Sequence, residues 1–277
     1  MINNQLLLDE VFGNVDIEGR ILCLHCSFSK VKNLFNDPDN LINYFMEKDC
    51  TLVVPVHNYA LRVWYNPVIN IIQNGLDMEE RTPQSSHIFY TKQARSISSA
   101  LGVVSKHVFL RKESVIGNHP ENSFAASGPE AEEIIHTQSP WNVYGPYDQI
   151  MMDDKALILL FGVDLSKATP VHYAELLSGR KPFIRWYRDE NGIIRPMRVG
   201  GCSNGFNACY PFISHLDLCK DRVNESIKIY PFREFIYELV NTIRHNPQIT
   251  CCSDPECTRC RDILKGGPCY SFKELKL

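Results

Sequence analysis

Continuous apolar runs and helical spacing alternate along the first two thirds of the chain. The apolar runs, each of a length typical of a buried strand, are Arg20–Cys26, Thr51–Val56 and Ala156–Val163. Helical segments are expected between them, around Leu41–Met46 and Ser127–Ile135. Strands separated by helices favour parallel pairing with helices on both faces of the sheet. The pattern predicts an α/β fold, a three-layer α/β/α sandwich with a mostly parallel central sheet.

Four further segments complete the predicted order of elements in this part of the chain. We expect a polar turn at Ser27–Lys30 and an irregular stretch at Arg62–Arg81, where Asn-Pro and Asn-Gly steps are turn signals. Ala94–Leu101 is expected to be helical, and Val108–Leu110 extended.

A hairpin and a long helix are predicted in the last third. Phe183–Arg188 and Ile193–Val199 flank Asn191 and Gly192, residue types that tolerate the positive φ of a tight turn. From Pro231 to His245, apolar residues recur at helical spacing, and proline suits the first helical position.

Charge and hydropathy narrow the class of protein. The chain of 277 residues has a formal net charge of −3 and no long run of Lys or Arg, so nucleic acid is not an expected partner. The N-terminal segment carries acidic residues where a signal peptide needs basic ones, and no stretch approaches the roughly 20 apolar residues of a membrane span. These features predict a cytoplasmic protein with no membrane partner.

A candidate catalytic pair follows the third predicted strand. Thr169 is the expected cap of a helix and Pro170 its expected first residue. His172 then shares a helix face with Glu175, three residues on. A carboxylate on one ring nitrogen fixes the tautomer, so that the other nitrogen can take a proton from an ammonium before the amine attacks a thioester. The spacing alone also fits a partly buried histidine beside a solvated glutamate.

Three ordered motifs carry a resemblance to a known family. They are GNHPENSFAASG at Gly117–Gly128, the step Ser139-Pro140-Trp141, and LILLFGVDLSKATPVHYAE at Leu157–Glu175. Together they resemble the aminoglycoside 3-N-acetyltransferase (antibiotic acetyltransferase) family. The resemblance implies an α/β/α enzyme linked to antibiotic resistance, which moves an acyl group from acetyl-CoA or another acyl-CoA directly to a primary amine of an amino sugar or aminoglycoside.

The resemblance also implies roles for individual residues. His172 would be the general base and Glu175 the residue that orients it, with Asp189 or Glu190 as alternatives for the orienting role. Coenzyme A would be held by residues of three separate segments, namely His25, Cys26, Ser27, Phe28, Thr82 and Asn118.

Two departures leave chemistry open. The family usually has Arg-Ser shortly before His-Pro, where this chain has Gly117-Asn118, so the acyl group is left open between acetyl and a longer chain. Cys26 lies at a strand end beside His25, which raises a covalent alternative because thiolates attack thioesters. We expect direct transfer.

Cysteines crowd at the C-terminal end. We expect a main domain, residues 1–248, and a cysteine-rich tail, residues 249–277, that holds five of the eleven cysteines. Four thiolates can surround a tetrahedral zinc ion. The predicted ligands are Cys251, Cys257, Cys260 and Cys269, with Cys252 as the alternative to Cys251. A structural zinc and free thiols both remain open.

The acceptor and the assembly are also open. An aminoglycoside needs an acidic pocket for its ammonium groups, whereas a nucleotide-linked amino sugar bound for a surface polysaccharide carries phosphates. Arg180, Lys181 and Arg185 favour the amino sugar. A non-catalytic family member that mediates protein contacts is the alternative from another class, and the assembly is left between a monomer and a homodimer.

Overall fold

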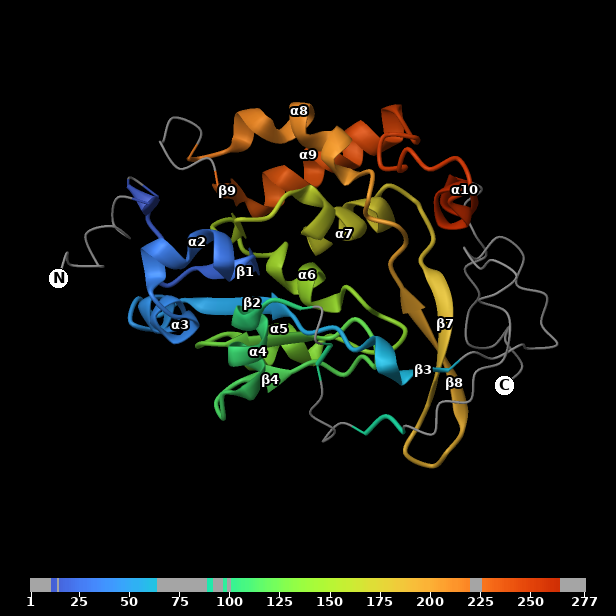
Figure 1. Cartoon of the computed structure of the whole chain (residues 1–277), viewed down its shortest axis with the longest axis horizontal. Coiled ribbons are helices and arrows are strands. Elements are labelled where there is room, and N and C mark those ends of the chain that lie inside the picture. The colour runs from blue at the N-terminus through green and yellow to red at the C-terminus, as the bar shows by residue number, and fades with distance from the viewer. Residues whose placement is uncertain are drawn as a thin grey trace.

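The structure is a computed structural model and describes residues 11–13, 15–63, 89–91, 97–98, 101–219 and 226–264. Within these residues, a six-stranded sheet has the order β4-β5-β2-β1-β6-β9 (Figure 1). Its strands are β1 (Ile21–Cys26), β2 (Thr51–Pro55), β4 (Val115–Ile116), β5 (Phe124–Ser127), β6 (Leu157–Phe161) and β9 (Ile227–Pro231). The three long apolar runs of the sequence therefore form its centre, as predicted.

The sheet is parallel at its centre and antiparallel toward its edges. β1 pairs parallel with β2 and with β6. The pairings β2–β5, β5–β4 and β6–β9 are antiparallel. The connection between β4 and β5 is too short for a crossover, so these two strands can only pair antiparallel. The predicted parallel arrangement thus holds for β2, β1 and β6, and the sheet as a whole is mixed.

Helices cover both faces of this sheet. Along β1, Ile21 and Cys23 belong to one hydrophobic cluster, whereas Leu22 and Leu24 belong to another. The first cluster includes residues of α5 (Ala131–His136), α6 (Gly145–Ile150), α7 (Thr169–Leu177), α8 (Tyr210–Ile213) and α9 (Phe232–His245). The second includes residues of α2 (Phe28–Phe35), α3 (Pro38–Met46) and α4 (Val103–Leu110). The alternation along each strand therefore divides the core in two.

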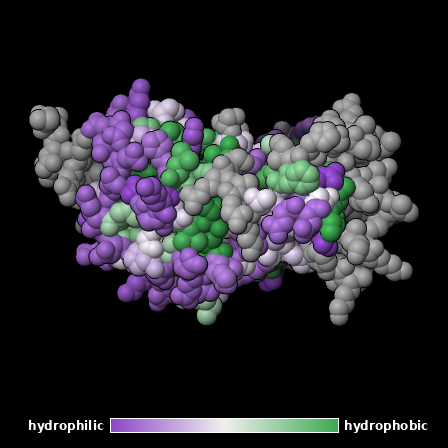
Figure 2. All heavy atoms as spheres, turned by 90° about the horizontal axis from the view of Figure 1, so that it is seen from below, coloured by the Kyte–Doolittle hydropathy of each residue, from purple (hydrophilic) through white to green (hydrophobic). Residues whose placement is uncertain are grey.

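Hydrophilic side chains cover much of the described surface that Figure 2 shows, and hydrophobic ones gather near the middle of that face. No helix among the described residues is both long and apolar enough to cross a membrane.

Three of the predicted segments differ from the structure. Phe28, placed in a polar turn, is the first residue of α2, and Val108–Leu110, expected to be extended, is the last turn of α4. The reason in α4 is that Val104, Val108 and Phe109 face the core at helical spacing. Ser127, expected to begin a helical segment, ends β5, and the helix that follows begins only at Ala131.

Two other predictions meet the limits of the described residues. Within the segment Ala94–Leu101, which was expected to be helical, Ile97, Ser98 and Leu101 are not helical, and its other residues are not described. Arg62 and Val63, expected to be irregular, form strand β3, while residues 64–81 are not described.

The predicted hairpin is present. β7 (Phe183–Arg188) pairs antiparallel with β8 (Ile194–Val199), and β3 adds a third strand beside β7. Gly192 adopts a φ of 79° in the turn, where the Asp189 carboxylate accepts two backbone N–H bonds. In Figure 1 the hairpin stands to one side of the main sheet, with α10 (Thr258–Leu264) near one end of it.

Replacing Leu159 by Ala is expected to destabilise the protein by about 2–5 kcal/mol, because this β6 side chain is fully buried and its loss leaves a cavity. Urea unfolding monitored by circular dichroism measures the change. Met152→Ala is the control, since 78% of Met152 is exposed. Equal stabilities of the two variants would contradict the placement of β6 in the core.

Candidate active site

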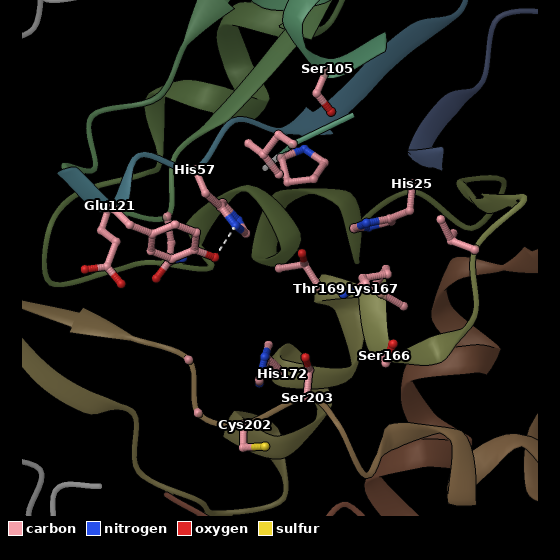
Figure 3. A pocket seen from close by; sticks show the side chains of 18 of the residues that line it. His25, His57, Ser105, Glu121, Ser166, Lys167, Thr169, His172, Cys202 and Ser203 are labelled. Atoms are coloured by element: carbon pink, nitrogen blue, oxygen red, sulfur yellow. Dashed lines mark hydrogen bonds between the residues drawn. The ribbon is translucent and has the colours of Figure 1, made fainter. Parts of the chain in front are cut away.

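A cavity of about 790 Å³ opens where the parallel strands end (Figure 3). His25 and Cys26 end β1, and His57 follows β2 by two residues. The loop after β6, residues 163–169, and the loop after β8, residues 200–204, complete much of the wall. Ligands of α/β proteins usually bind at the carboxyl ends of parallel strands. The position therefore marks this cavity as the candidate active site.

His172 lies in this cavity wall in contact with Glu175, as the spacing predicted. Ala168, and not Thr169 as expected, caps α7, so Thr169 and Pro170 take the first two helical positions and His172 follows in the same turn. Its Nδ1 lies 2.9 Å from Glu175 Oε2. A carboxylate accepts hydrogen bonds, so Nδ1 carries the proton and Nε2 is left with its lone pair. Nε2 makes no hydrogen bond with another described residue.

The imidazole ring is also held by packing. Phe206, in the short helix Phe206–Cys209, meets the ring edge-on with 4.7 Å between ring centroids. Gly200 passes so near that a Cβ there would lie 3.1 Å from His172 Cδ2 and 2.7 Å from the Tyr144 hydroxyl oxygen. Only a glycine lets the loop after β8 approach the ring so closely without displacing it.

Glu175 is buried in a network that reaches the C-terminal segment. Its Oε1 accepts hydrogen bonds from Arg180 Nη1 at 2.5 Å and from Thr250 Oγ1 at 2.8 Å. Arg180 also donates to Thr250 and to the carbonyl of Pro247. A buried carboxylate needs such partners to remain charged. The network therefore fixes the carboxylate on which His172 depends.

Two more histidines line the cavity opposite His172 (Figure 3). Burial lowers the pKa of His25 to about 3 and that of His57 to about 4, and repulsion from neighbouring histidines adds to the lowering of both pKa values. His57 Nδ1 lies 3.2 Å from the Tyr59 hydroxyl, while His57 Nε2 is buried and has no hydrogen-bond partner among the described residues. Both rings are therefore neutral and suited to contact a bound molecule.

His119 has a structural role in the same wall. Its Nδ1 accepts the backbone N–H groups of Glu121 and Asn122, and its Nε2 donates to the Arg198 carbonyl at 2.8 Å. Burial lowers the pKa of His119 to about 4. The ring thus joins the loop after β4 to β8, and Glu121, which this loop presents to the cavity, forms a buried ion pair with Arg62.

The residues proposed to hold coenzyme A are only partly gathered at the cavity. His25, Cys26 and Ser27 line it. Phe28 packs against the core behind it, and Asn118 accepts a hydrogen bond from the Tyr90 hydroxyl at 3.0 Å instead. Thr82 lies outside the described residues.

The geometry gives little support to Cys26 as a covalent nucleophile or to Asp189 as the residue that orients His172. Burial raises the pKa of Cys26 to about 12, so its thiol stays protonated near neutral pH and is a poor nucleophile. Asp189 pairs with Arg195 within the hairpin turn at 3.1 Å. Glu175 is the carboxylate that contacts His172.

Cysteines of the C-terminal segment meet a cysteine from the loop after β8. The sulfurs of Cys252, Cys257 and Cys260 cluster with that of Cys202, which the sequence did not single out. Cys252 takes the place expected for Cys251, whose sulfur contacts the Cys260 carbonyl. Cys269 lies outside the described residues.

Some cavity residues were missed at the sequence level although a signal existed for them. His57 lies two residues beyond the end of β2, and His25 lies in the last two residues of β1, so the rule on the ends of parallel strands would have found His57 as well. Glu121 lies inside the His-Pro motif itself. Cys202 carried no local signal, because its partners lie fifty or more residues further along the chain.

The chain belongs to the aminoglycoside 3-N-acetyltransferase family, whose model matches residues 23–198. A curated relative, aminoglycoside N(3)-acetyltransferase IV from Salmonella sp, is 29% identical over 165 residues. That match covers 58% of this chain, and the chain spans about half the length of this relative, 53%.

Solved structures share the fold. The apoenzyme of the aminoglycoside acetyltransferase AAC(3)-IVa aligns with a TM-score of 0.70 and 20% identity, over 95% of this chain and 97% of that one. The complex of AAC-IIIb with CoASH aligns with a TM-score of 0.66 and 15% identity, over 88% of this chain and 96% of that one. YokD from Bacillus subtilis aligns with a TM-score of 0.67 and 16% identity, over 88% of this chain and 99% of that one.

The buried histidines predict how stability depends on pH. Their folded pKa values of about 3 to 4 lie below the unfolded value of about 6.5, so only the unfolded chain takes up protons between these values. The free energy of unfolding therefore has its full value above about pH 6.5. It decreases as the pH is lowered from there, by up to about 1.4 kcal/mol per pH unit for each histidine.

Urea unfolding at several pH values measures this slope. His57→Gln is expected to reduce this slope between pH 4 and 6.5, and the exposed His136→Gln is the matched control. A slope that is the same in both variants would contradict the buried neutral state of His57.

Proposed function

We propose that the chain is an acyl-CoA-dependent N-acyltransferase in which His172 is the general base. The observation that carries this proposal is the contact of 2.9 Å between His172 Nδ1 and Glu175 Oε2, at the wall of a cavity large enough for a cofactor arm and a sugar. Membership of the aminoglycoside 3-N-acetyltransferase family supports the reaction class.

The proposed reaction is a direct transfer. His172 Nε2 takes a proton from the acceptor ammonium, and the amine nitrogen then attacks the thioester carbonyl carbon. The carbon–sulfur bond breaks as the carbon–nitrogen bond forms, and the nitrogen loses its second proton to solvent as it becomes an amide. The thiolate takes up one proton and leaves as free coenzyme A, and the imidazolium of His172 returns its proton to solvent. Glu175 stabilises the imidazolium formed in the first step, so it is a positioning residue.

The donor is proposed to enter past the ends of β1 and β2. The AAC-IIIb relative was solved with CoASH, which supports a coenzyme A donor for this family fold. His25 and Ser27 line this side of the cavity, and Lys167 and Arg259 add positive charge to its wall. Positive side chains and backbone amides suit the phosphates of coenzyme A.

An amino-sugar compound is the proposed acceptor. AAC(3)-IVa was solved with a gentamicin and with apramycin, which makes an aminoglycoside the first candidate. A nucleotide-linked amino sugar is the second, because the described cavity wall holds several cations and Glu121 as its carboxylate. Arg180 is not one of these cations, since it is bound to Glu175.

His172→Ala is expected to lower kcat by about 100- to 10,000-fold, because it removes the proton acceptor. The measurement is the rate of coenzyme A release from acetyl-CoA, which chromatography detects. The exposed His136→Ala is the matched control and should keep wild-type turnover. Undiminished turnover in His172→Ala would disprove the role of the general base.

Glu175→Gln is expected to lower kcat by roughly 10- to 100-fold with little change in KM, since it removes charge stabilisation of His172 without altering the cavity. It also leaves Arg180 with a neutral partner in a buried site, so the melting temperature should fall. Steady-state kinetics and thermal unfolding test the two parts separately. A fall in stability with kcat unchanged would mean that Glu175 is only structural.

The acceptor is tested with a panel of aminoglycosides and nucleotide-linked amino sugars, each offered with acetyl-CoA and with a longer acyl-CoA. Turnover with one class identifies the acceptor. Absence of turnover with every pair would favour a non-catalytic member of the family that acts through protein contacts.

A further inference from the structure

Four cysteine sulfurs meet at the edge of the candidate active site. They belong to Cys202, Cys252, Cys257 and Cys260, and all lie within 4.8 Å of one another. Cys202 comes from the loop after β8 that lines the cavity, and the other three from the C-terminal segment. Cys260 is buried and the other three are half-buried.

The distances fit a tetrahedral metal site. With a zinc–sulfur distance of about 2.3 Å, two sulfurs of a tetrahedral set lie about 3.8 Å apart. The sulfurs of Cys252 and Cys260 are 3.6 Å apart. A disulfide would bring them to about 2.05 Å, and all four cysteines are free thiols in the structure. The set therefore matches metal ligands better than disulfide partners.

The backbone around the four sulfurs is closely fitted. Cys257 and Cys260 form a C-x-x-C turn at the start of α10, and the Cys252 N–H donates to Cys260 Sγ at 3.3 Å. A Cβ at Gly205 would lie 2.2 Å from the Cys251 carbonyl oxygen. Glycine at this position thus allows the loop that carries Cys202 to lie directly against the segment that carries Cys252.

We propose that Cys202, Cys252, Cys257 and Cys260 bind one zinc ion. Thiolates are soft ligands, and a tetrahedral set of four sulfurs is typical of zinc. Binding releases the thiol protons to solvent. Four protein ligands leave no open position for water or substrate, so the ion is structural.

The ion would hold the catalytic pair from two sides. Thr250, two residues before Cys252, donates to Glu175 Oε1 at 2.8 Å, and Gly200, two residues before Cys202, lies against the His172 ring. A cross-link between Cys202 and the C-terminal segment therefore ties the wall beside His172 to the segment that buttresses Glu175. This inference goes beyond the proposed function, because metal content is measured whatever the activity.

The first test is the metal content of the full chain, produced without a histidine tag and analysed by inductively coupled plasma mass spectrometry. About one zinc per chain is expected. A protein that folds without bound zinc, or that holds iron instead, would overturn the proposal.

Neighbouring cysteines give the matched control. Cys252→Ser and Cys202→Ser are expected to lower the zinc content about tenfold or more, while Cys251→Ser keeps it. Retention of zinc in Cys202→Ser would overturn the site as assigned and leave one confined to the C-terminal segment. Equal loss in Cys251→Ser would overturn the choice of Cys252.

If these serine variants fail to fold, zinc release from the wild-type protein provides the test. An organomercurial that blocks thiols should release about one equivalent of zinc to a chromogenic chelator, and the released protein should unfold at a lower temperature. No release, or an unchanged unfolding temperature after release, would overturn a structural zinc.

Discussion

The structure depends on one buried carboxylate. Glu175 is only 4% exposed, and an ionised group in such a place is stable only when hydrogen bonds and positive charge replace the lost water. Arg180 and Thr250 supply these on one oxygen, which leaves the other oxygen for His172. The same contacts that keep the charge buried thus set the tautomer and direction of the imidazole ring.

Local patterns predicted much of the fold. Parallel strands with buried faces read as continuous apolar runs, so β1, β2 and β6 were found, and the turn residues of β7–β8 fixed the hairpin. The antiparallel edge strands were not predicted. β4 has only two residues, and the helix pattern that directly follows β9 obscured that strand. Short apolar segments such as Val108–Leu110 fit either state, and packing of α4 on the sheet decided the outcome.

In the candidate site, contacts between residues that are close in the sequence could be predicted, and contacts between distant residues could not. His172 and Glu175 are three residues apart, so helix geometry alone brought them together. Arg180 was interpreted as a charge for the acceptor, yet it binds Thr250, seventy residues further along the chain. The cysteine cluster likewise joins Cys202 to Cys252 across a fifty-residue separation. Spacing along a chain cannot reveal such contacts, since they depend on how the elements pack.

The link between Glu175 and Thr250 also constrains the order of events during synthesis. A ribosome makes the chain from the N-terminus, and domains begin to fold as they emerge. The central sheet is complete only after β9, and the carboxylate beside His172 obtains its Thr250 partner later still. Until Thr250 is made, the nascent chain therefore contains the His172–Glu175 pair without the full set of hydrogen bonds that stabilises the buried carboxylate.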